Sequence, residues 1–169
     1  MKIQVGGLSE GIHEYDFEVI SSELNLAKNF SHKVCVGATL DKTVNQMFLK
    51  ASIVTSGRFE CDRCISEFEI PLSSTYQMYY MSEGSDYEHR DPVEVQVIPH
   101  GVTVIDIADD VRQTILLSVP LKFLCREDCK GLCPQCGKDR NKEVCTCSTA
   151  VVDSRWDQLR IMREGDIQN

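Results

Sequence analysis

Residues 68–81 read FEIPLSSTYQMYYM, and apolar and polar side chains alternate along most of this stretch. A period of two residues is typical of an antiparallel strand that buries one face. One face carries Phe68, Ile70, Leu72, Tyr76, Met78 and Tyr80, and the other carries Glu69, Ser73, Thr75 and Gln77. Pro71 cannot donate a hydrogen bond to a neighbouring strand, so we expect an edge position or a bulge there.

Neighbouring segments extend this pattern into a sheet. Further strands are predicted at Lys33–Leu40, Gln46–Ser56 and Val93–Ile98. The polar stretch SEGSDYEHRDP at 82–92 is rich in residues that break regular structure, so it predicts a loop.

One main helix is predicted over residues 106–119. Asp106 is placed to cap its N-terminus, where negative charge is favourable. Its apolar face consists of Ala108, Val111, Ile115 and Val119. Pro120 ends it, because proline cannot continue a helix.

These elements predict an α+β fold, namely an antiparallel β-sheet or partial barrel packed by one main helix, with a C-terminal zinc-knuckle cluster. Residues 1–124 are expected to form a β-rich domain that includes the helix. Residues 125–169 are expected to form a cysteine-rich zinc-binding tail, docked on the first domain. Within the tail, Ser154–Met162 is expected to form a short second helix capped by Asp153.

The chain contains nine cysteines, six of them between Cys125 and Cys147. The first residues contain no long apolar run behind a basic start, so we expect no secretory signal. No stretch approaches the roughly 18 apolar residues of a membrane span. We therefore expect a cytoplasmic protein whose thiols stay reduced. In that setting clustered cysteines are typical of metal ligands.

The motif CPQCG at 133–137 is typical of a zinc knuckle. In such a turn both thiolates reach one ion and backbone N–H groups point at the first sulfur; Pro134 presets the turn, and Gly137 can adopt the left-handed conformation. The eight residues that follow Cys136 leave room for a small hairpin that returns the C-x-C pair. The predicted ligands of this closed site of four thiolates are Cys133, Cys136, Cys145 and Cys147.

The remaining cysteine pairs predict a second structural zinc site, which the spacing supports less strongly. It would join the C-x2-C between two strands to the C-x3-C after the helix, and so act as a long-range staple. Its ligands would be Cys61, Cys64, Cys125 and Cys129. A competing arrangement places Cys125, Cys129, Cys133 and Cys136 around one ion and leaves the other cysteines spare.

Other uses of the cysteines are less consistent with the sequence. A redox-active C-x-x-C opens a helix, whereas the residues after Cys64 continue as a strand. Reduced free thiols would leave the CPQCG spacing unexplained. Catalytic zinc needs an open coordination position, and the four histidines show no paired ligand spacing. We therefore expect no enzymatic activity, and we expect Cys35 to be an unpaired thiol.

The formal charge is −8, from 18 basic and 26 acidic residues. Two filled sites of four thiolates each would make it about −12. A binder of RNA phosphates needs a surplus of cations, so direct RNA contact through residues such as Lys130 or Arg140 is not favoured.

The order of these motifs resembles the YceD family, the large ribosomal RNA subunit accumulation proteins. The resemblance covers residues 45–160 and rests on ECDRC at 60–64, DIADDVRQTILLSVP at 106–120, CREDCKGLCPQCGKDRN at 125–141, CTC at 145–147 and DSRWDQL at 153–159. Ser154 stands where the family usually has proline. The resemblance implies a bacterial or plastid factor needed for normal accumulation of large-subunit ribosomal RNA.

An acidic protein meets basic ribosomal proteins favourably, so we expect a ribosomal protein or a pre-ribosomal particle of the large subunit as the partner. Arg155 and Trp156 are the candidate partner-binding residues. Alternatively, Trp156 and Leu159 cover the cysteine cluster as a local core. The main hypothesis is a non-enzymatic factor in ribosome assembly, without a membrane or small-molecule substrate; the alternative is a redox or metal-handling protein.

Overall fold

The strand predicted from residues 68–81 is present in the computed structural model as β5, Glu67–Ser82. Its predicted apolar face is buried or half-buried, whereas Glu69, Ser73, Thr75 and Gln77 are exposed. β5 pairs with β4, Gln46–Glu60, in one unbroken antiparallel register from Gln46↔Met81 to Glu60↔Glu67, so Pro71 causes no bulge. Because β6 pairs with β5 only at Tyr79–Ser82, Pro71 lies where β5 is an edge, as the sequence predicted.

The structure describes all residues except 31–32, 84–94, 148–153, 157, 159–160 and 162–169. The chain divides into two compact units. The first consists of Met1–Asp62 and Ser66–Cys125, and the second of Arg63–Ile65 and Arg126–Asn169. The predicted loop at 82–92 lies mostly outside the described residues. Within the predicted helix at 154–162, residues 157, 159–160 and 162 lie outside them. Docking of the tail on the β-rich domain stays a prediction.

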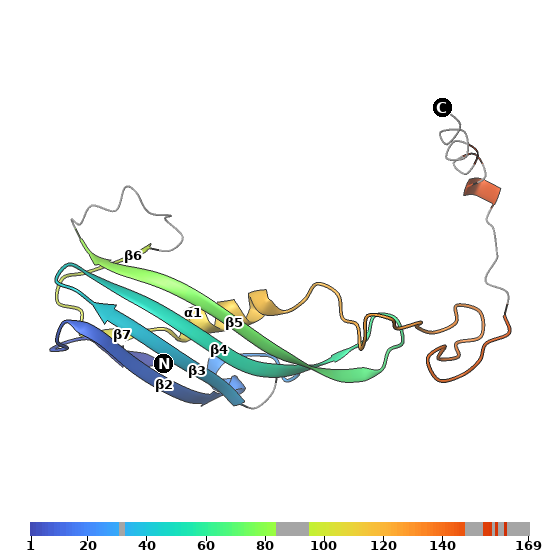
Figure 1. Cartoon of the computed structure of the whole chain (residues 1–169), viewed down its shortest axis with the longest axis horizontal. Helices are drawn as coiled ribbons and strands as arrows, with labels where there is room; N and C mark the ends of the chain where they lie inside the picture. Colours follow the sequence, from blue (N-terminus) through green and yellow to red (C-terminus); the bar gives the residue numbers. More distant parts are fainter. Residues whose placement is uncertain (31–32, 84–94, 148–153, 157, 159–160, 162–169) are drawn as a thin grey trace. The chain divides into compact units, whose positions relative to one another are not determined.

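A five-stranded sheet with the order β2-β3-β4-β5-β6 dominates the first unit (Figure 1). β2 is Gly11–Ile20, β3 is Lys33–Lys42 and β6 is Val95–Ile98. The pairs β2–β3, β3–β4 and β4–β5 are antiparallel, whereas β5–β6 is parallel. β1, Lys2–Gln4, and β7, Val104–Asp106, form a separate two-stranded sheet. The predicted sheet is therefore confirmed, with one parallel pair added.

One face of the large sheet is the core face, because the side chains of its central strands alternate between buried and exposed. Val34, Val36, Leu40, Leu49 and Ile53 are at most 2% exposed. The hydrophobic core on this face also includes Ile3 of β1 and Ile105 of β7. The opposite face carries exposed side chains such as Val54 and Glu14, and we call it the open face.

The main helix is α1, Ala108–Ser118, close to the predicted range. It buries Val111 and Ile115, two residues of the predicted apolar face, in the core cluster. The N-cap of α1 is Ile107, not the predicted Asp106, and it makes no side-chain capping bond; Asp106, one residue earlier, accepts a hydrogen bond from the Ala108 N–H at 3.0 Å. After α1, Ser154–Trp156 form a 3-10 turn, and the described residues Gln158 and Ile161 are also helical. No helix in the described part of the chain is long and apolar enough to cross a membrane.

The N-terminal strand β2 was not predicted. It carries a clean alternation, because Glu14, Asp16 and Glu18 are exposed while Tyr15 and Phe17 are half-buried. It is followed by the 3-10 turn η1, Ser21–Leu24, which buries Leu24. The alternation of acidic and aromatic residues was the signal that could have identified this strand.

Candidate metal centres

The first cysteine pair, Cys61 and Cys64, lies in the turn that joins β4 to β5. The turn is closed by a hydrogen bond of 3.0 Å from the Cys61 N–H to the Ser66 carbonyl. Ile65, directly after Cys64, has a φ of 60°. This is the left-handed conformation that a β-branched residue rarely adopts. The pair is therefore held by a tight turn at the end of a long hairpin.

Hydrogen bonds within the first unit hold the chain next to Cys61 beside the chain next to Cys125. The Asp62 N–H donates to the Phe123 carbonyl at 2.8 Å, and the Asp62 carboxylate accepts from the Phe123 N–H at 2.7 Å. The rings of Phe59 and Phe123 stack with centroids 4.4 Å apart. These contacts hold together two segments that are about sixty residues apart in sequence. Phe123 lies two residues before Cys125, the first member of the second cysteine pair.

Within the second unit, Arg63 organises the loop that carries Cys129. Its guanidinium donates to the Cys129 carbonyl at 2.8 Å and to the Glu127 carbonyl at 3.3 Å. Its own carbonyl accepts from the Leu132 N–H at 2.8 Å. Arg63 therefore binds the loop on both sides of Cys129.

Asn141 stabilises the same loop from its other end. Its amide oxygen accepts from the Lys130 N–H at 2.8 Å and from Arg126 at 2.8 Å. Its amide nitrogen lies 3.4 Å from the Cys129 sulfur and donates to it. Asn141 therefore ties the Cys129 side chain to the backbone of its own loop.

The knuckle at 133–137 has the geometry that its sequence predicts. The Gly137 N–H donates to the Cys133 carbonyl at 2.9 Å, and Gly137 has a φ of 73°. The Cys133 N–H donates to the Lys138 carbonyl at 2.8 Å. Backbone N–H groups of Cys136 and Gln135 also donate to the Cys133 sulfur, and they lower the pKa of this thiol to about 6.

The pKa values of two other thiols of this group, Cys145 and Cys147, shift in the opposite direction. Hydrogen bonding with Cys136 and then Cys145 raises the pKa of Cys147 to about 12. Thiolates so close together repel one another, and this repulsion opposes the ionisation of Cys145 and Cys147 in the absence of a cation. A divalent cation would remove that penalty and allow four thiolates.

Two groups of four cysteines bring their sulfurs within 4.8 Å of one another. The groups are Cys61, Cys64, Cys125 and Cys129, and Cys133, Cys136, Cys145 and Cys147. Both could hold a metal ion. These are the two sets that the spacing predicts, and the competing set from 125 to 136 is not brought together. That these residues are metal ligands stays a prediction.

The sulfur distances fit a tetrahedral ion. Zinc–sulfur bonds of about 2.3 Å in a tetrahedron separate the sulfurs by roughly 3.8 Å. The sulfurs of Cys136 and Cys145 are 3.6 Å apart. A donor set of cysteine sulfurs alone suits zinc.

Sequence analysis did not identify Asp62, Arg63 and Asn141 as residues that support the cysteines. The charged pair Asp62–Arg63 within the C-x2-C was the available signal for two of them. The candidate partner-binding residues Arg155 and Trp156 are both exposed, Trp156 by 59%. Leu159, which was expected to pack with Trp156, lies outside the described residues.

Gly131 lies in the second unit with a φ of 70°, and a Cβ there would come within 2.7 Å of the Arg63 carbonyl oxygen. We expect Gly131→Ala to lower the free energy of unfolding by about 2–5 kcal/mol, through left-handed strain and overpacking. Gly137→Ala is the matched control, because its φ is 73° but nothing lies within 4 Å. It should cost only about 1–2 kcal/mol. Thermal unfolding of both variants measures the difference. Equal losses of stability would contradict the close approach of Gly131 to Arg63.

Ile65 offers the opposite test. Its side chain is 64% exposed and its φ is 60°, so isoleucine gains little burial there and is strained. We expect Ile65→Gly to raise the free energy of unfolding by about 0.5–1 kcal/mol, because relief of the strain exceeds the entropic cost of glycine. Urea titration would show a higher midpoint. A lower midpoint would mean that the Ile65 side chain makes a stabilising contact.

The fold and the cysteine groups together define a class: a β-sheet protein with two groups of four cysteines that could hold metal ions. The family described as large ribosomal RNA subunit accumulation protein YceD matches residues 49–162. This range is two thirds of the chain and includes both cysteine groups. The chain belongs to the YceD family.

The chain is also similar to individual proteins. A chloroplastic large ribosomal RNA subunit accumulation protein YCED homolog 1 of Arabidopsis thaliana is 33% identical over 39% of this chain and 21% of its own length. Uncharacterized proteins of Mycobacterium tuberculosis and Mycobacterium bovis are 27% identical over 73% of this chain and 61% of their own length. The matched segments thus span less than two thirds of these relatives. No solved structure matches.

Proposed function

We propose that this protein is a non-enzymatic factor that supports the accumulation or processing of large-subunit ribosomal RNA and the assembly of that subunit. The observation that carries the proposal is the family match, which extends across both cysteine groups. The family is named for accumulation of this RNA, and so is the plant relative.

The proposed partner is a basic ribosomal protein of the large subunit, alone or in a pre-ribosomal particle. The charge of −8 supports a basic protein over naked RNA, because acidic surfaces repel phosphates and steer cationic partners. The exposed residues Arg155 and Trp156 are proposed as part of this contact. The proposed compartment is the cytoplasm.

Zinc is the proposed cofactor of both cysteine groups. The thiolate donor set and the 3.6 Å sulfur separation support this metal. When bound, the metal would supply cross-links and charge neutralisation, and the protein's own donors, such as the N–H groups at Cys133 and the amide of Asn141, would orient the ligands. The redox alternative is disfavoured because four-thiolate sites are closed to reactants.

Depletion of the protein in the organism that encodes it tests the proposal. We expect the ratio of large-subunit to small-subunit ribosomal RNA to fall, and precursor particles of the large subunit to co-purify with the wild-type protein at low salt. Complementation by Cys35→Ser should restore the ratio, because Cys35 belongs to neither cysteine group. An unchanged ratio together with no recovered particle would overturn the proposal.

A further inference from the structure

Strand β2 is an edge of the five-stranded sheet (Figure 1). All ten of its residues pair with β3, from Gly11↔Lys42 to Ile20↔Lys33, and no described strand pairs with its other side. An edge presents unpaired backbone N–H and C=O groups, which can pair with an added strand. β2 has neither a proline nor a break in register that would prevent such pairing.

The two faces of β2 differ sharply in chemistry. On the open face, Glu14, Asp16 and Glu18 are exposed in a row. Glu18 pairs with Lys33 at 2.7 Å, whereas no ion pair involves Glu14 or Asp16 among the described residues. On the core face, Tyr15 and Phe17 are half-buried, with ring centroids 6.3 Å apart. A strand beside β2 would meet negative charge on one face and aromatic surface on the other.

A hollow on the open face lies beside these acids. It is lined by Glu14, Tyr15, Asp16, Gly37, Ala38, Thr39, Lys50 and Ser52. Gly37 keeps it open, because a Cβ there would approach the Ser52 hydroxyl oxygen to 3.2 Å and the Asp16 carboxylate to 3.6 Å. A long cationic side chain of an added strand could lie in this hollow against Asp16, with hydroxyl groups as further acceptors.

We propose that β2 is a docking edge for an extended segment of a basic protein in which lysine or arginine alternates with apolar residues. The basic side chains would face Glu14 and Asp16, and the apolar ones would cover Tyr15 and Phe17. A second copy of this chain fits poorly, because antiparallel pairing of two β2 strands would place acids opposite acids. This inference rests on the proposed function in so far as the partner is a basic protein.

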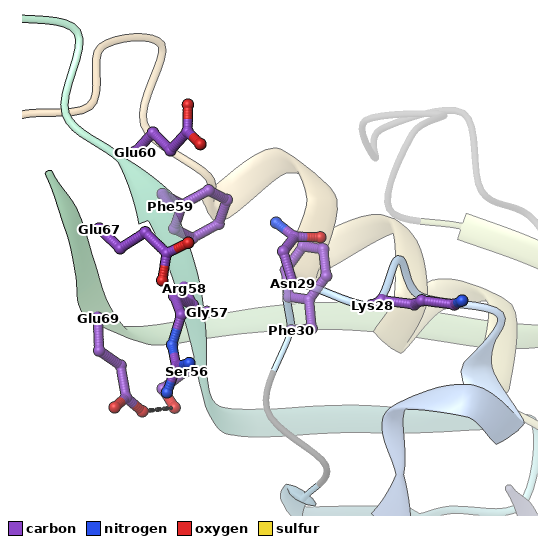
Figure 2. A pocket seen from close by; sticks show the side chains of 10 residues that line it. All are labelled: Lys28, Asn29, Phe30, Ser56, Gly57, Arg58, Phe59, Glu60, Glu67 and Glu69. Atoms are coloured by element: carbon purple, nitrogen blue, oxygen red, sulfur yellow. Dashed lines mark hydrogen bonds between the residues drawn. The ribbon is translucent and has the colours of Figure 1, made fainter. Parts of the chain in front are cut away.

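A second acidic hollow is the rival location (Figure 2). Its volume is about 610 Å³, and Glu60, Glu67 and Glu69 line it from β4 and β5. Two cations, Lys28 and Arg58, line it as well, whereas Lys50 is the one cation that lines the hollow beside Asp16. Glu69 is also already hydrogen-bonded to Ser56. These features make it a weaker receptor for cations than β2.

The test uses the full chain and a short capped peptide in which lysine alternates with valine. We expect binding by fluorescence anisotropy at low salt that weakens as salt is added. The same composition with lysines and valines in separate blocks, and a glutamate–valine peptide, should bind at least about tenfold more weakly, since neither matches both faces. Amide hydrogen exchange should slow in residues 11–20 when the lysine–valine peptide binds.

Charge reversal then locates the site. The double variant Glu14→Lys with Asp16→Lys should bind the lysine–valine peptide at least about tenfold more weakly, and it should bind the glutamate–valine peptide more tightly. The matched control, Glu60→Lys with Glu67→Lys, changes the charge equally and should leave binding unchanged. Loss of binding in the control alone would place the peptide in the rival hollow and overturn the inference.

Backbone methylation separates strand addition from a simple charge contact. Because N–H groups of a strand point alternately to its two sides, a peptide N-methylated on lysines and one N-methylated on valines should differ, with only one retaining binding. Equal binding would overturn the inference. If no peptide binds but large-subunit precursors still co-purify with the protein, then the docking edge is wrong and the proposed function stands.

Discussion

Protein purified without chelator should contain two zinc ions per chain, one for each four-cysteine group. Removal of the metal should have a large effect on the second unit. Residues 126–147, all of which the structure describes, contain no helix and no part of β1 to β7. They form turns, loops and the isolated bridge Leu132↔Asp139. Structural zinc contributes about 10–16 kcal/mol of apparent binding free energy in comparable small sites, so its loss should abolish order there.

Hydrogen exchange with and without chelator measures this effect. Amides of residues 126–147 should exchange rapidly in the metal-free protein, whereas β3 and β4 should stay protected by their own apolar core. A metal-free protein with unchanged protection in 126–147 would contradict the prediction.

Single cysteine variants assign the two ions. Cys136→Ser and Cys64→Ser should each leave one zinc ion, because they remove a ligand from different groups. The double variant should contain none. Cys35→Ser is the matched control and should keep both ions, because Cys35 lies on β3 outside both groups. Loss of both ions in either single variant would mean that the cysteines share ligands between sites.

Leu49→Ala should destabilise the β-sheet strongly. Leu49 is fully buried on β4, between Leu40 of β3 and Met78 of β5. A buried leucine-to-alanine change costs about 2–5 kcal/mol, because it removes apolar contacts and leaves a cavity. Since domains of this size are stable by only about 5–15 kcal/mol, the urea midpoint measured by far-UV circular dichroism should fall markedly.

Val54→Ala is the control on the same strand. Val54 is 55% exposed on the open face, so its truncation should cost less than about 1 kcal/mol. Comparable losses at both positions would show that the open face is covered by something in the folded protein.

Local features of the sequence predicted much of this structure. Alternation over 68–81 predicted β5, and the apolar period of 106–119 predicted the buried Val111 and Ile115 of α1. The CPQCG motif predicted a left-handed Gly137, because chain geometry within a few residues determines a knuckle. Each of these features is a periodicity or a turn, which depends on near neighbours alone.

Long-range contacts were beyond such reasoning. The parallel pairing of β5 with β6 has no local signature, because register between strands depends on packing across the sheet. Likewise, Asp62 bonds to Phe123, and Arg63 to the carbonyl of Cys129, across about sixty residues of sequence. Neither residue type marks such a partner by itself.

The nine cysteines show the same division. Their spacing by itself determined that eight of them form four pairs, with Cys35 left over, and that two sets of four were the simplest grouping. Only the tertiary structure decided that Cys125 and Cys129 join Cys61 and Cys64 rather than Cys133 and Cys136. The physical reason is that the hydrogen bonds of Asp62 and Arg63 place the hairpin turn beside those two cysteines before any metal is considered.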